Sequence, residues 1–492
     1  MKKLIKLLCV LLCAALTTSC MVPPALEEAA PALPTVAADD LAPLGDAGLQ
    51  HEAIAVLYLP ALNGQHLLAF YETLRFSGAQ HPAETILRAL LAHPGNSRVR
   101  SLGGAVQISL TGANPVEISG GVCTVNLSAS ALQLPLNDLY TAALAIAATL
   151  CETDGVEHVQ LLVAGTPIAM DISGCLPLGV LSGQTHQELP VLWEQFSSRR
   201  VPVGTDPADM PLTAAAALYF PVPDGGICAE ARRLTFPGQT PVQMTETLLL
   251  ALSDGVETLG TTDMPDLLAL LLRPPEASDL STGGKRITLC FPADVKERIA
   301  AQSIDPAACF AAIVYTLTSF IPSVQQVCIL VGDSALTSLY SPAMGSMLFP
   351  GGLHARADYA HALMDYVPLT IPDREALFVR AVPMPYRQAA SPRAMLLRMA
   401  QHLPPALTDA DVLGLSIDGD TLRINLSERY AQVLQAYPAQ QRLCAYAIVN
   451  TLCHHTGARR VRFYFGGRSV DALDGPILWS GEFIYNPGLI GP

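Results

Sequence analysis

The chain has 492 residues, half of them hydrophobic and only 15% charged, and its length predicts about three domains at roughly 100 to 200 residues per domain. This composition excludes a disordered chain, because it supplies ample apolar surface to bury. The 43 acidic and 29 basic side chains give a formal net charge of −14, which repels phosphate backbones, so we expect no nucleic acid partner.

The amino terminus has the features of an export signal. Residues 1–19 begin with lysines and continue with an apolar run from Leu7 to Leu16, which is too short for a permanent membrane span. The small residues before Cys20 resemble those of a bacterial lipoprotein signal, although Thr17 stands where leucine is commonest. This resemblance implies cleavage between Ser19 and Cys20 and acylation of Cys20. The alternative is an ordinary secretory peptide that is cut nearby without lipid.

Residues 20–50 are rich in proline, alanine and acidic residues and show neither helical nor strand periodicity. The sequence therefore predicts a tether between a lipid anchor and the folded part of the chain. We expect the protein to be exported and held at the outer face of the bacterial cell membrane.

A repeated order of elements follows the tether. Three segments run from an apolar helix into a strand that ends on glycine: Leu139–Gly165, Cys309–Gly332 and Leu443–Gly467. A Thr-Leu pair closes each helix, at Thr149, Thr316 and Thr451. A half-buried strand after a turn precedes each segment, beginning near Gly120, Gly283 and Asp418. Still further upstream, amphipathic helices begin with proline after His81, Thr240 and Ser391, and short apolar strands open the units at Val56, Ala217 and Ala376.

These elements predict an α+β fold of three tandem small sandwich units. Each unit has the order strand-helix-strand-helix-strand, with the helices packed on one face of a small sheet. We place the units at 51–202, 212–372 and 373–492, the first two with extensions and the third with a tail. The second helix of each unit is apolar nearly all round, so we expect the first helix or a neighbouring unit to cover it.

The segments between these elements carry their own expectations. Gly174–Pro202, Ser341–Pro372 and Gly475–Pro492 should fold back on the preceding unit as short strands or loops, whereas Val203–Leu212 should be a flexible boundary. The uncharged stretch Pro306–Gly332 could be taken for a membrane span, but Pro322 and two glutamines interrupt it, so it predicts a helix and then a strand.

Three stretches resemble the GerMN domain of sporulation and germination proteins. They are LYFPVPDGG at Leu218–Gly226, TLRINLSE at Thr421–Glu428 and YAIVNTLCHHTGARRVRFYFGGRSV at Tyr446–Val470. The resemblance implies a role in sporulation or spore germination. Similar family members are often lipoproteins, which agrees with the interpretation of Cys20.

The sequence carries no recognisable catalytic signature. The stretch GVLSG at Gly179–Gly183 places Ser182 wrongly for a nucleophile elbow. His354, Asp358 and His361 are spaced for one helical face and form the best polar cluster, which we interpret as a solvated surface. We therefore expect no enzyme activity, no cofactor and no metal site.

Asparagine and serine recur at matching strand ends, at Asn126, Ser128, Asn425 and Ser427. We interpret them as turn or cap residues that satisfy backbone groups. Nine cysteines follow Cys20, and an odd number cannot be fully paired within one chain. Most of these cysteines lie in apolar runs, so we expect buried free thiols.

Together these observations predict a non-enzymatic, membrane-anchored envelope lipoprotein that acts as a scaffold or interaction protein in sporulation or spore germination. Its expected partners are the membrane, through Cys20, envelope or sporulation proteins, peptidoglycan, and further copies in an oligomer. One alternative is an exported lipoprotein that binds a solute or a peptidoglycan fragment between its units. A wall hydrolase or amidase ranks last, because no zinc triad or carboxylate pair is visible.

Overall fold

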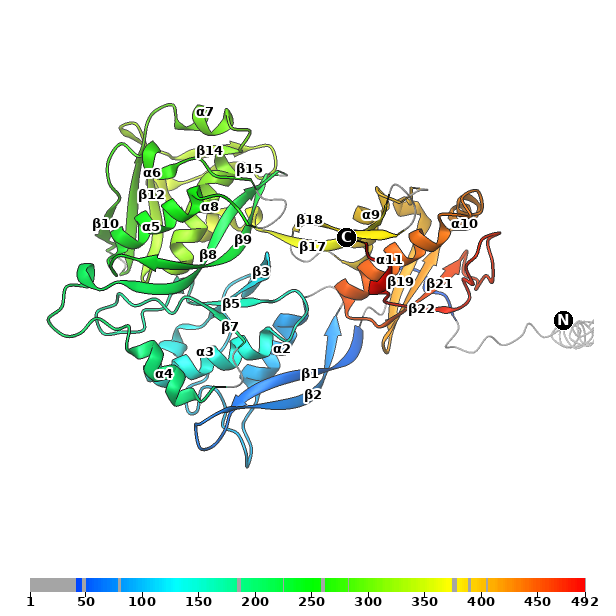
Figure 1. The fold of residues 1–492 in the computed structure, drawn as a ribbon, viewed down its shortest axis with the longest axis horizontal. Coiled ribbons are helices and arrows are strands. Elements are labelled where there is room, and N and C mark those ends of the chain that lie inside the picture. Colours follow the sequence, from blue (N-terminus) through cyan, green and yellow to red (C-terminus); the bar gives the residue numbers. More distant parts are fainter. Residues whose placement is uncertain are drawn as a thin grey trace, which may run out of the picture. The chain divides into compact units, whose positions relative to one another are not determined.

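The computed structural model describes residues 41–46, 50–77, 81–183, 187–223, 225–257, 262–281, 283–373, 378–387, 391–403 and 406–491. The expected signal peptide, Cys20 and most of the expected tether lie outside these residues. The described chain follows three successive sets of elements, which we call the first, second and third units (Figure 1).

The first unit combines a long β-hairpin with helices and a five-stranded sheet. Its elements are β1 (Gln50–Pro60), β2 (Leu67–Ser77), α2 (Pro82–Ala92), β3 (Val116–Ser119), β4 (Val122–Leu127), η2 (Ala129–Gln133), α3 (Leu136–Leu150), β5 (His158–Val163), β6 (Thr166–Pro167), β7 (Val180–Ser182) and α4 (Leu189–Ser197). In the sheet, β4 lies between antiparallel β3 and parallel β5, and β5 also pairs antiparallel with β6 and β7. The long helix α3 makes the crossover that a parallel pair requires.

The second unit repeats this plan and adds a small hairpin. Its elements are η3 (Pro207–Asp209), β8 (Leu212–Val222), β9 (Gly226–Phe236), α5 (Pro241–Ser253), α6 (Leu267–Leu270), β10 (Glu276–Asp279), β11 (Lys285–Phe291), α7 (Val295–Ala300), α8 (Pro306–Phe320), β12 (Val324–Val331), β13 (Ser334–Ala335), β14 (Ser338–Ser341), β15 (Gly345–Leu348), η4 (Pro350–Gly352), β16 (Leu353–Ala355) and η5 (Arg356–Ala362). Its sheet has β11 between antiparallel β10 and parallel β12, and β12 pairs antiparallel with β13 and β16.

The third unit shows the same pairing. Its elements are β17 (Met364–Pro372), β18 (Val379–Arg387), α9 (Pro392–Ala400), η6 (Asp409–Asp411), β19 (Val412–Asp418), β20 (Thr421–Leu426), α10 (Glu428–Gln435), α11 (Gln441–Thr456), β21 (Arg460–Phe465), β22 (Glu482–Ile484) and η7 (Pro487–Leu489). Here β20 lies between antiparallel β19 and parallel β21, and β22 closes the sheet beside β21.

The α+β prediction is confirmed, with additions to the expected order of elements. Each opening strand is half of a long antiparallel hairpin, and each predicted middle strand pairs with an antiparallel strand before it. The segments expected to fold back do so through β7, β16 and β22, each of which pairs with the strand after the long helix of its unit. The end of Ser341–Pro372 instead forms β17 of the third unit. The stretch Pro306–Gly332 forms α8 and β12, as predicted. Among the described residues, we find no helix that combines the length and apolar character needed to cross a bilayer.

Two expectations about boundaries need correction. The sequence predicts that a strand from Ala376 opens the third unit, but β17 opens it and β18 follows as the second strand of the hairpin. Ala376 and Leu377 themselves lie outside the described residues. The expected flexible boundary Val203–Leu212 contains the turn η3, whose Pro207 carbonyl accepts a hydrogen bond from the Gln239 amide at 2.8 Å.

The threonines that close the three long helices bind the hairpins to them. The Thr149 hydroxyl accepts a hydrogen bond from the Tyr58 amide of β1 at 2.9 Å. In the same way, the Thr316 hydroxyl accepts from the Tyr219 amide of β8 at 3.0 Å. The third copy repeats this bond from the β17 amide of Thr370 to the hydroxyl of Thr451 at 2.9 Å. All three hydroxyl-bearing residues are buried, so these bonds fix each hairpin against its helix.

The proline-led helices α2, α5 and α9 begin as the sequence predicts. Thr240 and Ser391 accept amide hydrogen bonds from Gln243 and Ala394, at 3.3 and 3.2 Å. The His81 ring has the same role at α2. Each cap satisfies an amide that would otherwise have no partner in the first turn.

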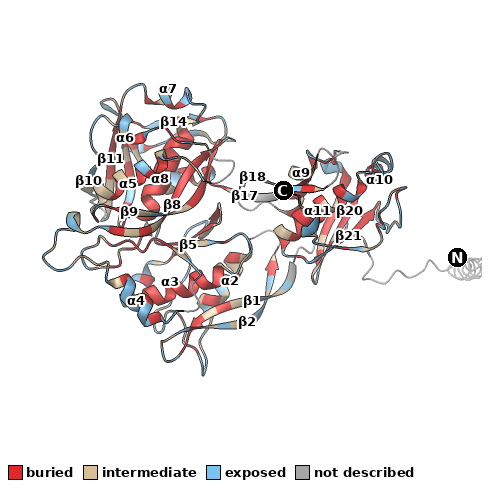
Figure 2. Cartoon of the chain, in the orientation of Figure 1, coloured by how far each residue is buried: buried red, intermediate tan, exposed pale blue. Residues whose placement is uncertain are grey.

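The described apolar residues form two large cores. One core joins the first and second units, from Ala55 to Leu363, and the other belongs to the third unit, from Leu369 to Phe483. Helix α8 is buried from Ala307 to Phe320 (Figure 2). A helix that is apolar all round needs cover on every side, and α8 obtains it from its own sheet, its own hairpin and the first unit.

We predict that Thr451→Val lowers the free energy of unfolding of the third unit by about 1–3 kcal/mol, because the buried Thr370 amide loses its acceptor. Trp479 lies in the core of this unit, so its fluorescence during urea unfolding, in a Trp193→Phe background, reads the effect. Thr451→Ser keeps the hydroxyl and is the matched control. An unfolding free energy of Thr451→Val equal to that of the parent would contradict the role of this hydrogen bond.

Candidate functional site

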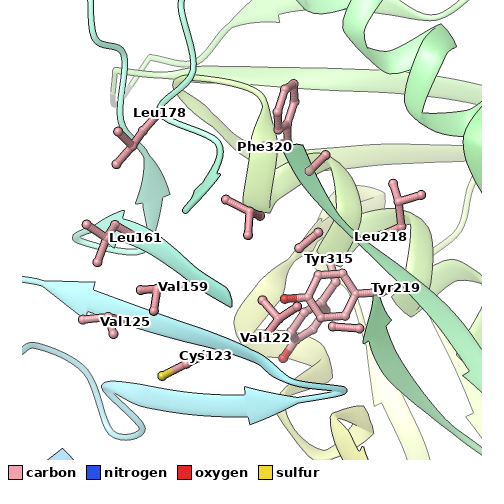
Figure 3. Packing of buried hydrophobic residues seen from close by; sticks show 14 of the residues in the cluster. Val122, Cys123, Val125, Val159, Leu161, Leu178, Leu218, Tyr219, Tyr315 and Phe320 are labelled. Carbon is pink, nitrogen blue, oxygen red and sulfur yellow. The ribbon is translucent and has the colours of Figure 1, made fainter. Parts of the chain in front are cut away.

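Several buried polar side chains contact one another at the junction between the first and second units. We define the outer face of each sheet as the face opposite its long helix. In the first unit, Thr124, Gln160 and Leu162 lie on the outer face and are nevertheless buried. Figure 3 shows Tyr219 and Tyr315 of the second unit beside Val122 of the first sheet, and the Tyr219 hydroxyl lies 3.5 Å from that of Thr124.

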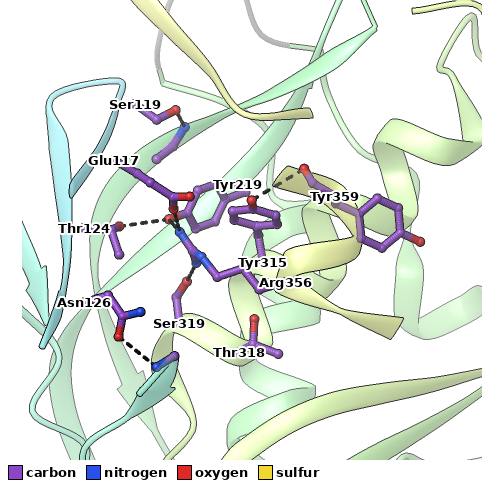
Figure 4. Close-up of polar contacts among 12 residues, drawn as sticks. Glu117, Ser119, Thr124, Asn126, Tyr219, Tyr315, Thr318, Ser319, Arg356 and Tyr359 are labelled. Atoms are coloured by element: carbon purple, nitrogen blue, oxygen red, sulfur yellow. Dashed lines mark hydrogen bonds and ion pairs between the residues drawn. The ribbon is translucent and has the colours of Figure 1, made fainter. Parts of the chain in front are cut away.

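Arg356 is at the centre of this junction (Figure 4). Its guanidinium donates to the Glu117 carboxylate at 2.8 Å and to the Ser319 hydroxyl at 2.6 Å. It also donates to the Tyr219 hydroxyl at 3.3 Å and lies over the Tyr315 ring, 4.1 Å from its centroid. Burial by itself lowers the pKa of Arg356, but Tyr219 and Glu117 more than offset this, so the net pKa is raised. The arginine therefore stays charged, as a buried ion pair requires.

A second set of contacts holds the turn between β3 and β4 against β9 of the second unit and β17 of the third. The Ser119 hydroxyl accepts a hydrogen bond from the Ala229 amide at 3.0 Å, and the Gly120 amide donates to Asp365 at 2.9 Å. Gly120 has a φ of +54°, and a Cβ there would lie 1.9 Å from the Ala229 carbonyl oxygen. Only glycine fits this close approach. Backbone contacts therefore fix this turn closely against the neighbouring strand.

Sequence reasoning missed this cluster. Arg356, Glu117 and Tyr219 are far apart in the sequence, and single charges or tyrosines do not form a motif. One signal was present in the repeats: a tyrosine precedes the apolar end of the first strand in both VLYLP and ALYFP, at Tyr58 and Tyr219.

We predict that Arg356→Met destabilises the shared core of the first two units by about 3–5 kcal/mol, because Glu117 is left as a buried, unpaired charge. The double variant Glu117→Gln with Arg356→Met should recover most of this loss. The measurement is urea unfolding followed by Trp193 fluorescence in a Trp479→Phe background. Arg298→Met, which breaks an exposed pair with Asp294, is the control and should cost less than about 1 kcal/mol.

The predicted histidine cluster does not form a shared face. His354 lies in β16 and is fully buried, whereas His361 is exposed at the end of η5. Asp358 accepts the Ala355 amide at 2.8 Å and so has a local capping role. The solvated helix face expected for these residues is therefore wrong for His354, because the segment is a strand and a short 3₁₀ turn.

His354 is a neutral core residue. Its Nε2 donates to the Leu336 carbonyl at 3.1 Å, and its Nδ1 accepts from the Tyr359 hydroxyl at 2.8 Å. Its ring also stacks on Phe349, with the centroids 3.9 Å apart. Burial lowers the pKa of His354 from 6.5 to about 4. A group that is buried without charge in this way has a structural role.

The folded protein should therefore lose stability in acid. Between pH 6.5 and about 4 the unfolded chain binds a proton at His354 that the folded chain does not, so stability falls as pH falls through this range. The expected loss from this group is about 2–3 kcal/mol. Unfolding free energies measured from pH 7 to 4.5 should depend less steeply on pH in His354→Gln, whereas His361→Gln should match the parent. An unchanged slope in His354→Gln would contradict the assignment.

The paired asparagines act as turn residues, as expected. Asn126 accepts the Gly165 amide at 2.8 Å, and Asn425 accepts the Gly467 amide at 3.0 Å. Both bonds join the end of one strand to the glycine after its parallel neighbour.

The paired serines differ in detail. Ser427 caps α10 by accepting from the Tyr430 amide at 3.1 Å. Ser128 accepts the Ser109 amide at 3.2 Å in place of a helix cap. Ser182 lies in the short strand β7, so the structure gives it no elbow turn.

All nine cysteines after Cys20 lie within the described residues and are free. Six of them are buried: Cys123, Cys228, Cys290, Cys309, Cys444 and Cys453. Burial raises the pKa of the Cys309 and Cys444 thiols to about 12, so these thiols stay protonated and unreactive. Within the described ranges, no group of three or more His, Cys, Asp or Glu side chains is arranged to hold a metal ion.

The end of the expected tether contacts the third unit. Residues 43–46 lie beside β19, where the Gly45 amide donates to the Leu413 carbonyl at 2.8 Å. Asp46 forms an ion pair with Arg393 at 2.7 Å. The sequence predicted a free linker as far as residue 50. This is corrected, because the chain contacts the third unit from Pro43 onward, where the Pro43 carbonyl accepts a hydrogen bond from the Asn425 side chain.

Comparisons with known proteins agree with this architecture. Residues 56–169 and 369–471 match the model of the family Germane, described as sporulation and spore germination. The solved tandem GerMN domains of the sporulation protein GerM from Bacillus subtilis are 17% identical and cover 57% of this chain and 91% of theirs, with a TM-score of 0.21. The first GerMN domain of the same protein is 19% identical and covers 23% of this chain and 84% of its own, with a TM-score of 0.20. No curated protein matches the chain.

The two matched segments coincide with the first unit and the third unit, each of which has the hairpin, the long helix and the mixed sheet described above. These two segments are therefore GerMN-type domains, similar to those of sporulation and spore germination proteins.

Proposed function

We propose that the chain is a non-enzymatic, membrane-anchored envelope lipoprotein that acts as a scaffold in sporulation or spore germination. We also infer that the second unit is a third copy of the GerMN-type unit, since its strands pair in the same order as those of the matched segments. The process follows from the family match, and the anchor follows from the signal that ends at Cys20.

One observation carries the scaffold role. The outer sheet face of the first unit binds the hairpin and long helix of the second unit through apolar contacts and the Arg356 cluster. This face therefore works as a protein-binding surface already within one chain. Envelope or sporulation proteins, peptidoglycan and further copies of the chain are the partners that we propose for surfaces of this kind.

Anchoring can be tested by separating membranes from soluble envelope material. We expect Cys20→Ala to move the tagged protein from the membrane fraction to the soluble fraction, because the thiol that we propose to be acylated is lost. Cys13→Ala changes a cysteine inside the signal segment and should stay with the membrane. Equal partition of the native chain and Cys20→Ala would contradict a lipid anchor.

The scaffold role can be tested by crosslinking the tagged native chain in intact cells, in vegetative and in sporulating cultures. We expect capture of envelope or sporulation proteins that depends on Cys20. A chain that recovers no envelope partner in either culture would contradict the scaffold role.

A further inference from the structure

The threonine bonds define matching positions in the first two hairpins. Tyr58 and Tyr219 each donate their amide to the threonine of the long helix, and each pairs across its hairpin with an alanine, Ala69 or Ala229. Because side chains alternate along a strand, the residues two and four positions before each tyrosine share its face. The two hairpin faces can therefore be compared position by position.

The tyrosine face of the second hairpin is used within the chain. The Tyr219 hydroxyl lies 3.5 Å from the Thr124 hydroxyl on the outer face of the first sheet. The Ala229 amide donates to Ser119 of the same unit. Four residues before Tyr219, the Ala215 carbonyl oxygen would lie 2.8 Å from a Cβ on Gly179, so the backbones approach closely there as well.

The matching face of the first hairpin is open. It has Ile54, Val56 and Tyr58 on β1 and Tyr71 and Thr73 on β2. Ile54 is 70% exposed and Tyr71 is 75% exposed, although they lie diagonally next to each other and are both large apolar residues. The Tyr58 hydroxyl donates to the exposed Glu152 at 3.0 Å. The tyrosine face of the hairpin is thus buried in the second unit and largely exposed in the first.

The outer face of the second sheet repeats residues of the first. Glu117 and Thr124 are direct partners in the first sheet, and Glu276 and Thr288 are direct partners at the same place in the second. Leu330 of β12 corresponds to Leu162 of β5, since each pairs with the residue two after its threonine. In the first unit Thr124 and Leu162 are buried and Glu117 is half-buried, whereas Thr288 and Leu330 are half-buried and Glu276 is exposed.

The third sheet lacks this pattern. The position of the threonine is taken by Arg423, that of the glutamate by Ser416, and that of the leucine by Tyr464. Of the three outer faces, those of the first two units therefore share the residues that receive a tyrosine hairpin.

We propose that the open tyrosine face of the first hairpin, around Ile54 and Tyr71, docks on the outer face of the second sheet, around Thr288 and Leu330, of a second copy of this chain. The contact reproduces between chains the junction that joins the first and second units within one chain. The proposal rests on the scaffold function above and names the partner and the surface.

One charged pair can form across the two surfaces. Glu152 follows Thr149 by three residues, as Ser319 follows Thr316, and Ser319 is where Arg356 binds in the internal junction. The second sheet presents Arg286 on its outer face, where it can meet such an acidic group. The two surfaces differ, so the contact is heterologous. Each copy can bind one neighbour through its first hairpin and another through its second sheet.

Site-directed photocrosslinking tests the contact with the full-length protein, both in intact cells and purified in detergent. The probe is p-benzoylphenylalanine, incorporated at Tyr71. We expect an adduct of twice the chain mass whose crosslinked peptide lies in Lys285–Phe291 or Val324–Val331. The same probe at Tyr340, which is 70% exposed on β14, is the matched control and should give at least tenfold less of this adduct.

A second variant tests the receiving face. Thr288→Arg should reduce the Tyr71 adduct at least tenfold, and Arg423 at the matching position shows that this strand of the fold accommodates arginine. An unchanged Trp193 unfolding midpoint would confirm that the variant is folded; if the midpoint falls, Thr288→Lys is used in its place.

The outcomes separate this inference from the general function. No double-mass adduct, or one that maps elsewhere and resists Thr288→Arg, overturns the docking proposal even if sporulation proteins are captured. A Tyr71 adduct that maps to β11 or β12 supports it even if no other envelope protein is captured.

Discussion

The hydrogen bond from each hairpin to a buried helix threonine is the constraint on which the rest of the structure depends. A two-stranded hairpin is marginally stable by itself in water, so its position must come from packing on another element. Apolar contacts alone do not fix register, because they are not directional. A hydroxyl aimed at one amide does, since a slip by one residue would reverse every side chain of the strand. The bond therefore decides which way Tyr58 and Tyr219 point.

Local patterns in the sequence predicted most of the elements but not their assembly. The recurrent Thr-Leu pair marked the helix ends correctly, yet its function was hidden, because a threonine in an apolar helix commonly bonds within that helix. The partner of Thr316 is Tyr219, 97 residues away in the sequence, and a local pattern cannot predict a contact over such a separation. Short strands such as β3 and β10 were missed for a related reason. Four residues are too few to show alternation, and their pairing decides their structure.

The remaining differences arose where one unit departs from the others. The opening of the third unit was misplaced because its hairpin lacks the turn glycines that mark the second, and several prolines obscure its alternation. His354 was assigned to a surface helix because its spacing to His361 fits a helical period equally well. Only the aromatic and carbonyl partners supplied by distant segments show that it is buried. The Arg356 cluster could not be predicted either, since its members come from four separate segments.

The buried ion pair at the junction gives orientation more than stability. Replacement of such a pair by well-packed apolar residues is often neutral or stabilising, because desolvation offsets the attraction. Its value here is that Arg356 reaches Glu117, Ser319 and Tyr219 together only in one arrangement of the two units. A sheet face of threonine, glutamate and leucine can thus select one orientation of a tyrosine hairpin.

The shared core of the first two units has a consequence for the order in which the chain matures. The first unit ends with β7 and α4, but the arginine that neutralises Glu117 lies at residue 356. At about 5–20 residues per second, synthesis of the intervening stretch takes roughly 10–30 s. During that interval the first unit carries an uncovered sheet face with an acidic residue that has no internal partner. Folding of this half of the protein is therefore completed only after the second unit has emerged, and any factor that binds the growing chain would meet this face first.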